Sequence, residues 1–284
     1  MLDMTDEGTP AALIPQSVLD AFGLTGAVDL LPGGEGRSVR VGSVVLKPTD
    51  DGDEASWVAE LLTRLDESAG FRLARPVWAR DGRWVVDGWS ASRLVAGETG
   101  PAGRWPLLLA AARAFHASLR PTSRPAFLAL RTHRWALADR VAWGESAFEP
   151  LPDVRPLMDR LMAVRRPVSA DCQLVHGDLS GNVLFADGLA PAIIDFSPYW
   201  GPAAYADAII AVDGLLWYGA DPGLLTLAGT TPEFPQLIVR ALIFRLVAHN
   251  EHARLSEGSS PNELVQFEAA VREAESLTHG VRAT

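Results

Sequence analysis

The sequence predicts an α+β fold with a β-rich N-terminal part and a larger, mainly helical C-terminal part. Short strand-like runs dominate the first third of the chain, and apolar residues at helical spacing dominate the rest. A pair of short apolar runs, at 183–185 and 192–194, interrupts the helical region and predicts a hairpin there. We place the junction near residues 90–97, which gives predicted domains of 1–95 and 96–284.

The composition is that of a globular protein and argues against several classes. With 284 residues and 48% hydrophobic side chains, the chain can bury a sizeable core. No run approaches the ~18 apolar residues of a membrane span, and the acidic start "MLDMTDEG" is unlike a secretory signal. The single cysteine, Cys172, excludes an internal disulfide. We therefore expect a cytoplasmic protein without a membrane partner.

The charge balance argues against nucleic acid as a partner. The 35 acidic and 25 basic side chains leave a formal net charge of −10. Such a surface repels phosphate backbones, so we expect no nucleic-acid partner, although a role in solubility alone also accounts for the charge. The sequence predicts no particular oligomeric state.

Each element of the N-terminal part follows from local patterns. Strand-like runs are separated by a glycine-rich loop, "PGGEG", and by the turn Gly42-Ser43. A helix with acidic residues in its first turn follows, and the dipeptide Asp81-Gly82 marks a further turn between strands. The expected elements are a helix at 15–22, strands at 28–31, 38–41 and 44–47, a helix at 53–67, and extended runs on both sides of Asp81-Gly82 as far as about residue 95.

The C-terminal part is expected to be helical except for the hairpin. The two apolar runs of that hairpin flank Asp187-Gly188, a dipeptide typical of tight turns. Helical periodicity predicts helices at 105–119, 133–143, 156–164, 205–218, 235–252 and 262–277.

Polar residues gather around the hairpin in the stretch "LVHGDLSGNVLFADGLAPAIIDFS". Asp178 lies on a polar loop after "QLV", where its carboxylate can accept a hydroxyl proton. Asn182 opens the first hairpin run and Asp195 ends the second, and both side chains carry the hard oxygen atoms that Mg²⁺ prefers. Phosphoryl transfer needs such parts, a metal on the phosphates and a carboxylate that orients the attacking hydroxyl. The alternative is a hairpin whose polar residues only cap turns.

The segment "HGDLSGNVLF" followed by "IIDFS" resembles the catalytic and metal-binding segments of the aminoglycoside phosphotransferase family, relatives of choline kinases and protein kinases. The resemblance extends more loosely from residue 31 to about 218. It implies a bilobal protein-kinase-like fold, with Asp178 as the catalytic base and Asn182 and Asp195 as Mg²⁺ ligands. The loop between Asp178 and Asn182 has one residue fewer than the family's. Gly181 can adopt backbone angles closed to other residues, so a tighter turn can still deliver the Asn182 amide to the metal.

The N-terminal third resembles the nucleotide-binding lobe of the same family. The stretch "PGGEGRSVRVGSVVLK" is similar to its glycine-rich turn and to the strand lysine that contacts nucleotide phosphates. The resemblance also implies a glutamate partner for this lysine on the next helix, and adenine contacts with the main chain of the segment joining the lobes. Glu54 is preferred over Glu60 because Glu54 lies at the edge of the apolar stripe of the helix. The residues so implied are Gly33, Gly34, Gly36, Lys47, Glu54, and Ala91, Ser92 and Arg93 in the joining segment.

The function so implied is transfer of the γ-phosphoryl group of ATP or GTP, with Mg²⁺, to a hydroxyl of a small molecule. The rival interpretation is a catalytically weak or inactive kinase-like protein that binds nucleotide as a scaffold. A metal-dependent phosphoesterase is disfavoured, because no D-x-H precedes the motif and Val183 stands where that chemistry needs histidine. We expect His176 to order the catalytic loop and Asp207 to have a structural role.

The acceptor is the part of the function that the sequence defines least. Four acidic residues of the C-terminal part suit a cationic amino sugar or amino alcohol, but acidic side chains on helices are usually only solvated. They are Asp139, Glu145, Asp213 and Glu251.

Overall fold

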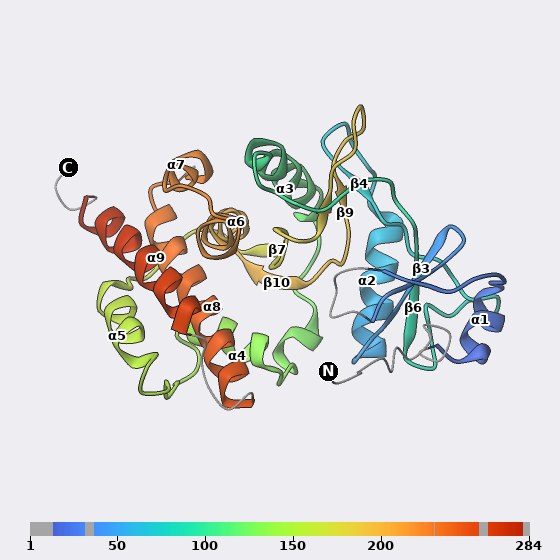
Figure 1. The fold of residues 1–284 in the computed structure, drawn as a ribbon, viewed down its shortest axis with the longest axis horizontal. Helices are drawn as coiled ribbons and strands as arrows, with labels where there is room; N and C mark the ends of the chain where they lie inside the picture. The colour runs from blue at the N-terminus through green and yellow to red at the C-terminus, as the bar shows by residue number, and fades with distance from the viewer. Residues whose placement is uncertain (1–13, 32–36, 230, 256–260, 281–284) are drawn as a thin grey trace, which may run out of the picture. The chain divides into compact units, whose positions relative to one another are not determined.

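The computed structural model describes residues 14–31, 37–229, 231–255 and 261–280 (Figure 1). The chain divides into two compact units. Residues 1–97 with 192–195 form one, called here the N-terminal unit, and residues 98–191 with 196–284 form the other, the C-terminal unit. The predicted division into domains 1–95 and 96–284 stays a prediction. The glycines predicted to contact nucleotide, Gly33, Gly34 and Gly36, lie outside the described residues.

The N-terminal unit is built on a five-stranded antiparallel sheet in the order β1-β2-β3-β6-β5. This arrangement of strands around helix α2 confirms the expectation of a small antiparallel sheet. A separate strand, β4, pairs in parallel with β9. The elements are α1 (Gln16–Phe22), β1 (Asp29–Leu30), β2 (Val39–Val41), β3 (Val44–Pro48), α2 (Gly52–Arg64), β4 (Arg72–Leu73), β5 (Val85–Val86), β6 (Trp89–Arg93) and β9 (Ala192–Ile193).

Alternating burial explains how the sheet forms its core. Val39, Val41, Val44 and Leu46 are buried on β2 and β3, and Phe22 of α1 belongs to the same apolar cluster. Because side chains alternate across a strand, this places one face of the hairpin in the core.

Helix α2 begins where its sequence supplies a cap. The side chain of Asp51 accepts hydrogen bonds from the main-chain N–H groups of Asp53 and Glu54, both at 3.0 Å. Such a cap satisfies amide groups that have no partner within the helix.

The predicted turn at Asp81-Gly82 does not join two strands. The hairpin turn lies six residues later, at Asp87-Gly88, where both residues have positive φ (48° and 75°) and β5 and β6 flank a two-residue loop. This geometry suits the right-handed twist of paired strands. The run before Asp81 forms only an isolated bridge to β6, between Pro76 and Ser92.

The C-terminal unit is mainly helical, and all of the helices predicted for it form, with ends shifted by three residues or fewer. The sequence analysis missed the short helices η3 and α7 and the antiparallel pair β7 and β10. The elements are α3 (Trp105–Leu119), η3 (Ala126–Ala129), α4 (Arg134–Trp143), α5 (Arg155–Val164), β7 (Gln173–His176), β8 (Val183–Leu184), β10 (Pro198–Gly201), α6 (Ala203–Trp217), α7 (Gly223–Ala228), α8 (Phe234–Leu255) and α9 (Pro261–Gly280).

Helix α8 forms the centre of this unit. It contacts α4, α5, α6 and α9, and these helices surround it in Figure 1. Its residues from Leu237 to Ala248 are all buried, including Arg240 and Arg245. A helix that is apolar all round is expected to be buried. In the described part of the chain, no helix has the length and apolar content needed to cross a membrane.

Candidate functional site

The loop that carries Asp178 leaves strand β7 at its buried end. His176 ends the strand, and Gly177 follows against the ring of Tyr199 on β10. A Cβ atom on Gly177 would lie 2.3 Å from Cδ2 of Tyr199, closer than any side chain tolerates. Glycine is therefore needed here for close approach, which gives a physical reason for the glycine of the "HGD" motif.

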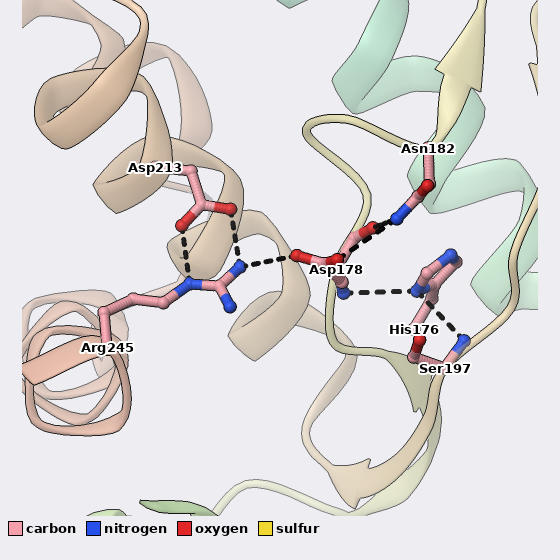
Figure 2. A network of polar contacts seen from close by, with 6 residues as sticks. All are labelled: His176, Asp178, Asn182, Ser197, Asp213 and Arg245. Atoms are coloured by element: carbon pink, nitrogen blue, oxygen red, sulfur yellow. Dashed lines mark hydrogen bonds and ion pairs between the residues drawn. The ribbon is translucent and has the colours of Figure 1, made fainter. Parts of the chain in front are cut away.

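His176 orders the loop, as expected from the sequence. Its side chain is buried, and its Nδ1 atom accepts hydrogen bonds from the N–H groups of Asp178 (3.1 Å) and Ser197 (3.5 Å) (Figure 2). The Nε2 atom of His116 accepts a bond from the His176 N–H at 3.0 Å. Burial, followed by the influence of His176, lowers the pKa of His116 to about 3, so His116 is neutral and can accept.

The short loop after Asp178 closes as a tight turn. The N–H of Asn182 donates to the carbonyl of Leu179 at 3.0 Å. The Asn182 Nδ2 atom donates to the main-chain carbonyl of Asp178 (2.7 Å) and to its Oδ2 atom (3.1 Å), so the amide reaches back across the loop. Gly181 does not adopt positive φ, so the left-handed conformation that the sequence analysis invoked is not used.

Asp178 is exposed, yet it is attached to a buried cation that sequence analysis missed. The Nη2 atom of Arg245 on α8 lies 2.9 Å from Asp178 Oδ1. The side chain of Arg245 is 3% exposed and that of Asp178 is 51% exposed. Arg245 also makes two bonds of 2.7 Å to Asp213 on α6, from Nε to Oδ1 and from Nη2 to Oδ2. Figure 2 shows the guanidinium between the two carboxylates.

Burial and ion pairing act in opposite directions within this network. Burial by itself lowers the pKa of Arg245, but the carboxylates of Asp213 and Asp178 raise it above its ordinary value, so Arg245 stays charged. Burial raises the pKa of Asp213, and Arg245 opposes the shift. Asp213, predicted as a candidate for binding a cationic acceptor, therefore has a cation of the protein as its partner.

In the N-terminal unit the structure brings Lys47 and Asp195 together. The Nζ atom of Lys47 on β3 lies 2.5 Å from Oδ2 of Asp195, which follows β9. Asp195 has φ of 51°, a left-handed conformation that is uncommon for residues other than glycine and that occurs at functional sites. Both side chains are more than one third exposed, so a solute can reach them. Asp178 and Asn182 form the corresponding pair of the C-terminal unit.

The other residues of the N-terminal unit that are predicted to contact nucleotide lie on two elements, α2 and β6. Glu54 is half-buried in the first turn of α2, whereas Glu60 is exposed. Ala91, Ser92 and Arg93 lie within β6, opposite Leu46, Val45 and Val44 of β3. For each of these residues, a role in binding nucleotide stays a prediction.

The main chain of residues 91–93 also forms hydrogen bonds on the edge of β6 that faces away from β3. The Ala91 carbonyl accepts from the N–H of Val77 at 2.9 Å, and the Arg93 N–H donates to the carbonyl of Arg75 at 2.7 Å. These main-chain groups are therefore engaged within the sheet before any base binds.

The acidic residues considered for a cationic acceptor all have cations near them. Glu251 pairs with Arg254. Asp139 and Glu145 line a cavity of about 170 Å³ next to β10, and three arginines line the same cavity, Arg124, Arg131 and Arg140. Because the cavity carries both charges, its acidic residues no longer favour a cationic acceptor.

Asp207 has the structural surroundings that the sequence led us to expect. It is buried on α6, and its Oδ2 atom lies 2.8 Å from Nε of Arg113 on α3. Burial raises the pKa of Asp207 to about 6, and the hydrogen bond from Arg113 opposes that shift.

The oxygen side chains expected to bind metal suit Mg²⁺, which takes part of its ligands from phosphates and water, better than a metal bound by protein side chains alone. Among the residues that the structure describes, no group of three or more His, Cys, Asp or Glu side chains is placed to hold a metal. Mg²⁺ is commonly bound by one or two protein oxygen ligands together with phosphates and water. The amide oxygen of Asn182 in the C-terminal unit and the carboxylate of Asp195 in the N-terminal unit are each a ligand of that kind.

The fold matches those of solved small-molecule phosphotransferases. The chain is 15% identical to a choline/ethanolamine kinase family protein from Mesorhizobium loti, with a TM-score of 0.58 over 99% of this chain and 100% of that one. It is 16% identical to a thermostable mutant of aminoglycoside phosphotransferase APH(4)-Ia, solved with ADP and hygromycin B, with a TM-score of 0.57 over 94% and 98% of the two chains. It is 17% identical to APH(2″)-IIia in its GDP and kanamycin complex, with a TM-score of 0.56 over 94% and 97%.

These likenesses confirm the bilobal kinase-like fold that the motif implied. At such identities they show the fold alone. No family model matches the sequence, and no curated protein matches it either.

Proposed function

We propose that the chain is a phosphotransferase that moves the γ-phosphoryl group of ATP or GTP to a hydroxyl of a small molecule. The observation that carries the proposal is the state of Asp178, an exposed carboxylate whose two oxygen atoms are held by Arg245 and by Asn182. Phosphoryl transfer depends on positioning the acceptor and on electrostatics, so a fixed carboxylate open to solvent suits the acceptor hydroxyl. The solved neighbours with nucleotides and small-molecule acceptors support this proposal.

The nucleotide side of the proposed site uses Lys47 and Asp195. Lys47 would exchange its bond with Asp195 for the phosphates, and Asp195 and Asn182 would hold Mg²⁺. When bound, the ion would neutralise charge on the phosphate oxygens. The exposure of both Lys47 and Asp195, at 39% and 38%, supports this exchange because neither side chain must leave a buried position.

The purine base is proposed to bind residues 94–97 rather than 91–93. The main chain of 91–93 is bonded on both edges of β6, and the N–H of Leu94 donates to the carbonyl of Ser43. Among the described residues, none forms a hydrogen bond with the main chain of Val95. Its N–H and carbonyl are therefore the groups of this segment best suited to a base.

A transfer assay tests the proposal. The protein is incubated with Mg²⁺, ATP or GTP and a panel of aminoglycosides, amino alcohols, macrolides and sugars, and phosphorylated products are measured. Asp178→Asn should lower transfer by ~10²- to 10⁴-fold because the basic oxygen is lost, while nucleotide affinity stays within about twofold.

Asp187→Asn is the matched control, since Asp187 is also exposed and its turn tolerates asparagine. It should leave transfer unchanged. Equal transfer by the wild type and Asp178→Asn would overturn the assignment of Asp178.

A kinase-like protein that binds nucleotide without turnover is the second candidate. The observation that favours it is the ion pair of Lys47 with Asp195, which occupies the group expected to meet the phosphates and one of those expected to hold Mg²⁺. Tight nucleotide binding with no product from any acceptor, and no nucleotide hydrolysis, would support this candidate over the first.

A further inference from the structure

Arg245 connects the exposed loop of Asp178 to the interior of the C-terminal unit. It lies on the central helix α8, in an apolar stretch where a charge is costly unless it is paired. Its guanidinium forms three hydrogen bonds, two with Asp213 and one with Asp178. All of the residues in this network belong to the C-terminal unit.

The guanidinium is fixed from several directions. Asp213, itself only 2% exposed, holds it through two bonds in the fork geometry that arginine favours. Three aromatic rings lie within 5.4 Å of its central carbon, those of Trp135, Trp217 and Phe244. Because arginine keeps its charge and its planar shape, Nη2 is a rigid donor aimed at the loop.

Asp178 is the exposed partner that this rigid donor holds. The side chain is about half exposed, and rotation about its bonds would cost little without a fixed contact. Arg245 holds Oδ1 at 2.9 Å and Asn182 holds Oδ2 at 3.1 Å. Each carboxylate oxygen can accept more than one hydrogen bond, so both contacts leave room for an acceptor hydroxyl.

We propose that Arg245, oriented by Asp213, is the positioning residue for Asp178. Asp213 sets the plane of the guanidinium, Nη2 then sets the orientation of the Asp178 carboxylate, and the carboxylate orients the acceptor hydroxyl. This inference rests on the proposed function for its catalytic meaning. The ordinary alternative is a buried ion pair that stabilises α6 against α8 and does not affect the loop.

The first experiment compares two substitutions on the same helix. Asp213→Asn removes the charge that orients Arg245, and Asp207→Asn removes an equally buried carboxylate that pairs with Arg113 instead. Both variants lose the ion pair of a buried carboxylate, so a loss of stability is expected for both. Only Asp213→Asn is connected to Asp178.

The readouts are release of phosphate from Mg²⁺–ATP and Mg²⁺–GTP with water as acceptor, nucleotide affinity, and a crystal structure of each variant. Asp213→Asn should lower phosphate release by ~10²-fold, the effect of a misplacement of about 1 Å, with nucleotide affinity unchanged. Its Asp178 carboxylate should leave the position that it holds in the wild type. Asp207→Asn should keep both the rate, within about threefold, and the position of Asp178.

Arg245 itself supplies the second experiment. Arg245→Gln should release the Asp178 carboxylate in the crystal, and Arg245→Lys should restore its position only in part, because one ammonium cannot reproduce the fork. If Asp178 keeps its place in both Asp213→Asn and Arg245→Gln, the positioning role is overturned whatever the rates. If the wild type itself releases no phosphate and transfers none, the proposed function fails, while movement of Asp178 in these variants still supports the positioning role.

Discussion

Asp139 gives a prediction whose size follows from its surroundings. It is a largely buried carboxylate on α4, and no hydrogen-bond partner is present for its Oδ1 atom among the described residues. Burial, followed by the charge of Glu145, raises the pKa of Asp139 from 3.8 to about 7. Because the folded protein binds this proton more tightly than the unfolded chain does, the stability contribution is complete below pH 3.8 and is lost as the pH rises through 7.

The expected magnitude is large enough to measure. Each pKa unit corresponds to about 1.4 kcal/mol, so this group lowers the free energy of unfolding by about 3 kcal/mol between pH 5 and pH 8. Asp139→Asn cannot ionise and should not show this part of the pH dependence. Urea denaturation of the wild type and Asp139→Asn at several pH values measures the difference between their stability profiles.

A partner substitution sharpens the test. Glu145→Gln removes the second cause of the shift, so between pH 5 and pH 8 its stability should fall by less than that of the wild type but by more than that of Asp139→Asn. Parallel stability profiles for the wild type and Asp139→Asn would refute the reasoning, since they would mean that Asp139 has its ordinary pKa in the folded protein.

Three further substitutions test the proposed site. Asp195→Asn should weaken nucleotide binding in calorimetry with Mg²⁺ far more than without it, and an equal loss under both conditions would contradict the ligand role. Gly177→Ala should reduce stability by ~1–3 kcal/mol in urea and lower turnover, because its Cβ would overlap Tyr199, while Gly181→Ala, whose Cβ would be 3.5 Å from its nearest neighbour, should do neither. Val95→Pro should weaken binding of ATP and GTP by removing an N–H, whereas Val95→Ala should not; equal affinity for both variants would place the base elsewhere.

The elements that the sequence predicted well are those defined by local pattern. The helices at 105–119 and 133–143 have regular apolar spacing, and the structure reproduces them to within a residue. The turn at Asp81-Gly82 was placed wrongly because another Asp-Gly pair lies six residues later, at Asp87-Gly88, with the same local signal. The local signal does not distinguish the two pairs, and the pairing of β5 with β6 across Asp87-Gly88, which is a tertiary effect, selects the second.

The motif residues could be read from the sequence, but their contacts could not. The spacing of Asp178 and Asn182 indicated a shared loop, and the structure shows the amide of Asn182 bonded to Asp178. The ion pair between Lys47 and Asp195 joins residues 148 positions apart, so nothing local predicts it. Asp139 was considered either as an acid for a cationic acceptor or as a solvated acid, because the cavity that it lines together with Tyr199 of β10 forms only in the folded chain.

The connection of Asp178 to Arg245 was hidden for a different reason, although the sequence contains part of its signal. Arg245 stands in "ALIFRLVA" and Asp213 in "AIIAVDGLLW", and neither has an opposite charge three or four residues away on its own helix. A charge in a run that is apolar all round must find its partner on another element. The sequence therefore indicates that a buried acid and a buried base should meet across helices.

The sequence does not indicate which acid meets which base. Helix α6 carries two buried aspartates, Asp207 and Asp213, and the chain offers Arg113, Arg240 and Arg245 as partners within apolar helical runs. The fold resolves this choice by packing: α3 brings Arg113 to Asp207, and α8 brings Arg245 to Asp213. Only the second pairing extends to Asp178, because Nη2 of Arg245 bonds both carboxylates. The two aspartates of α6 are thus alike in charge and burial, and each pairs with an arginine, but the pairs differ in what they reach. For that reason Asp207→Asn is the control that can separate positioning of Asp178 from the loss of a buried carboxylate.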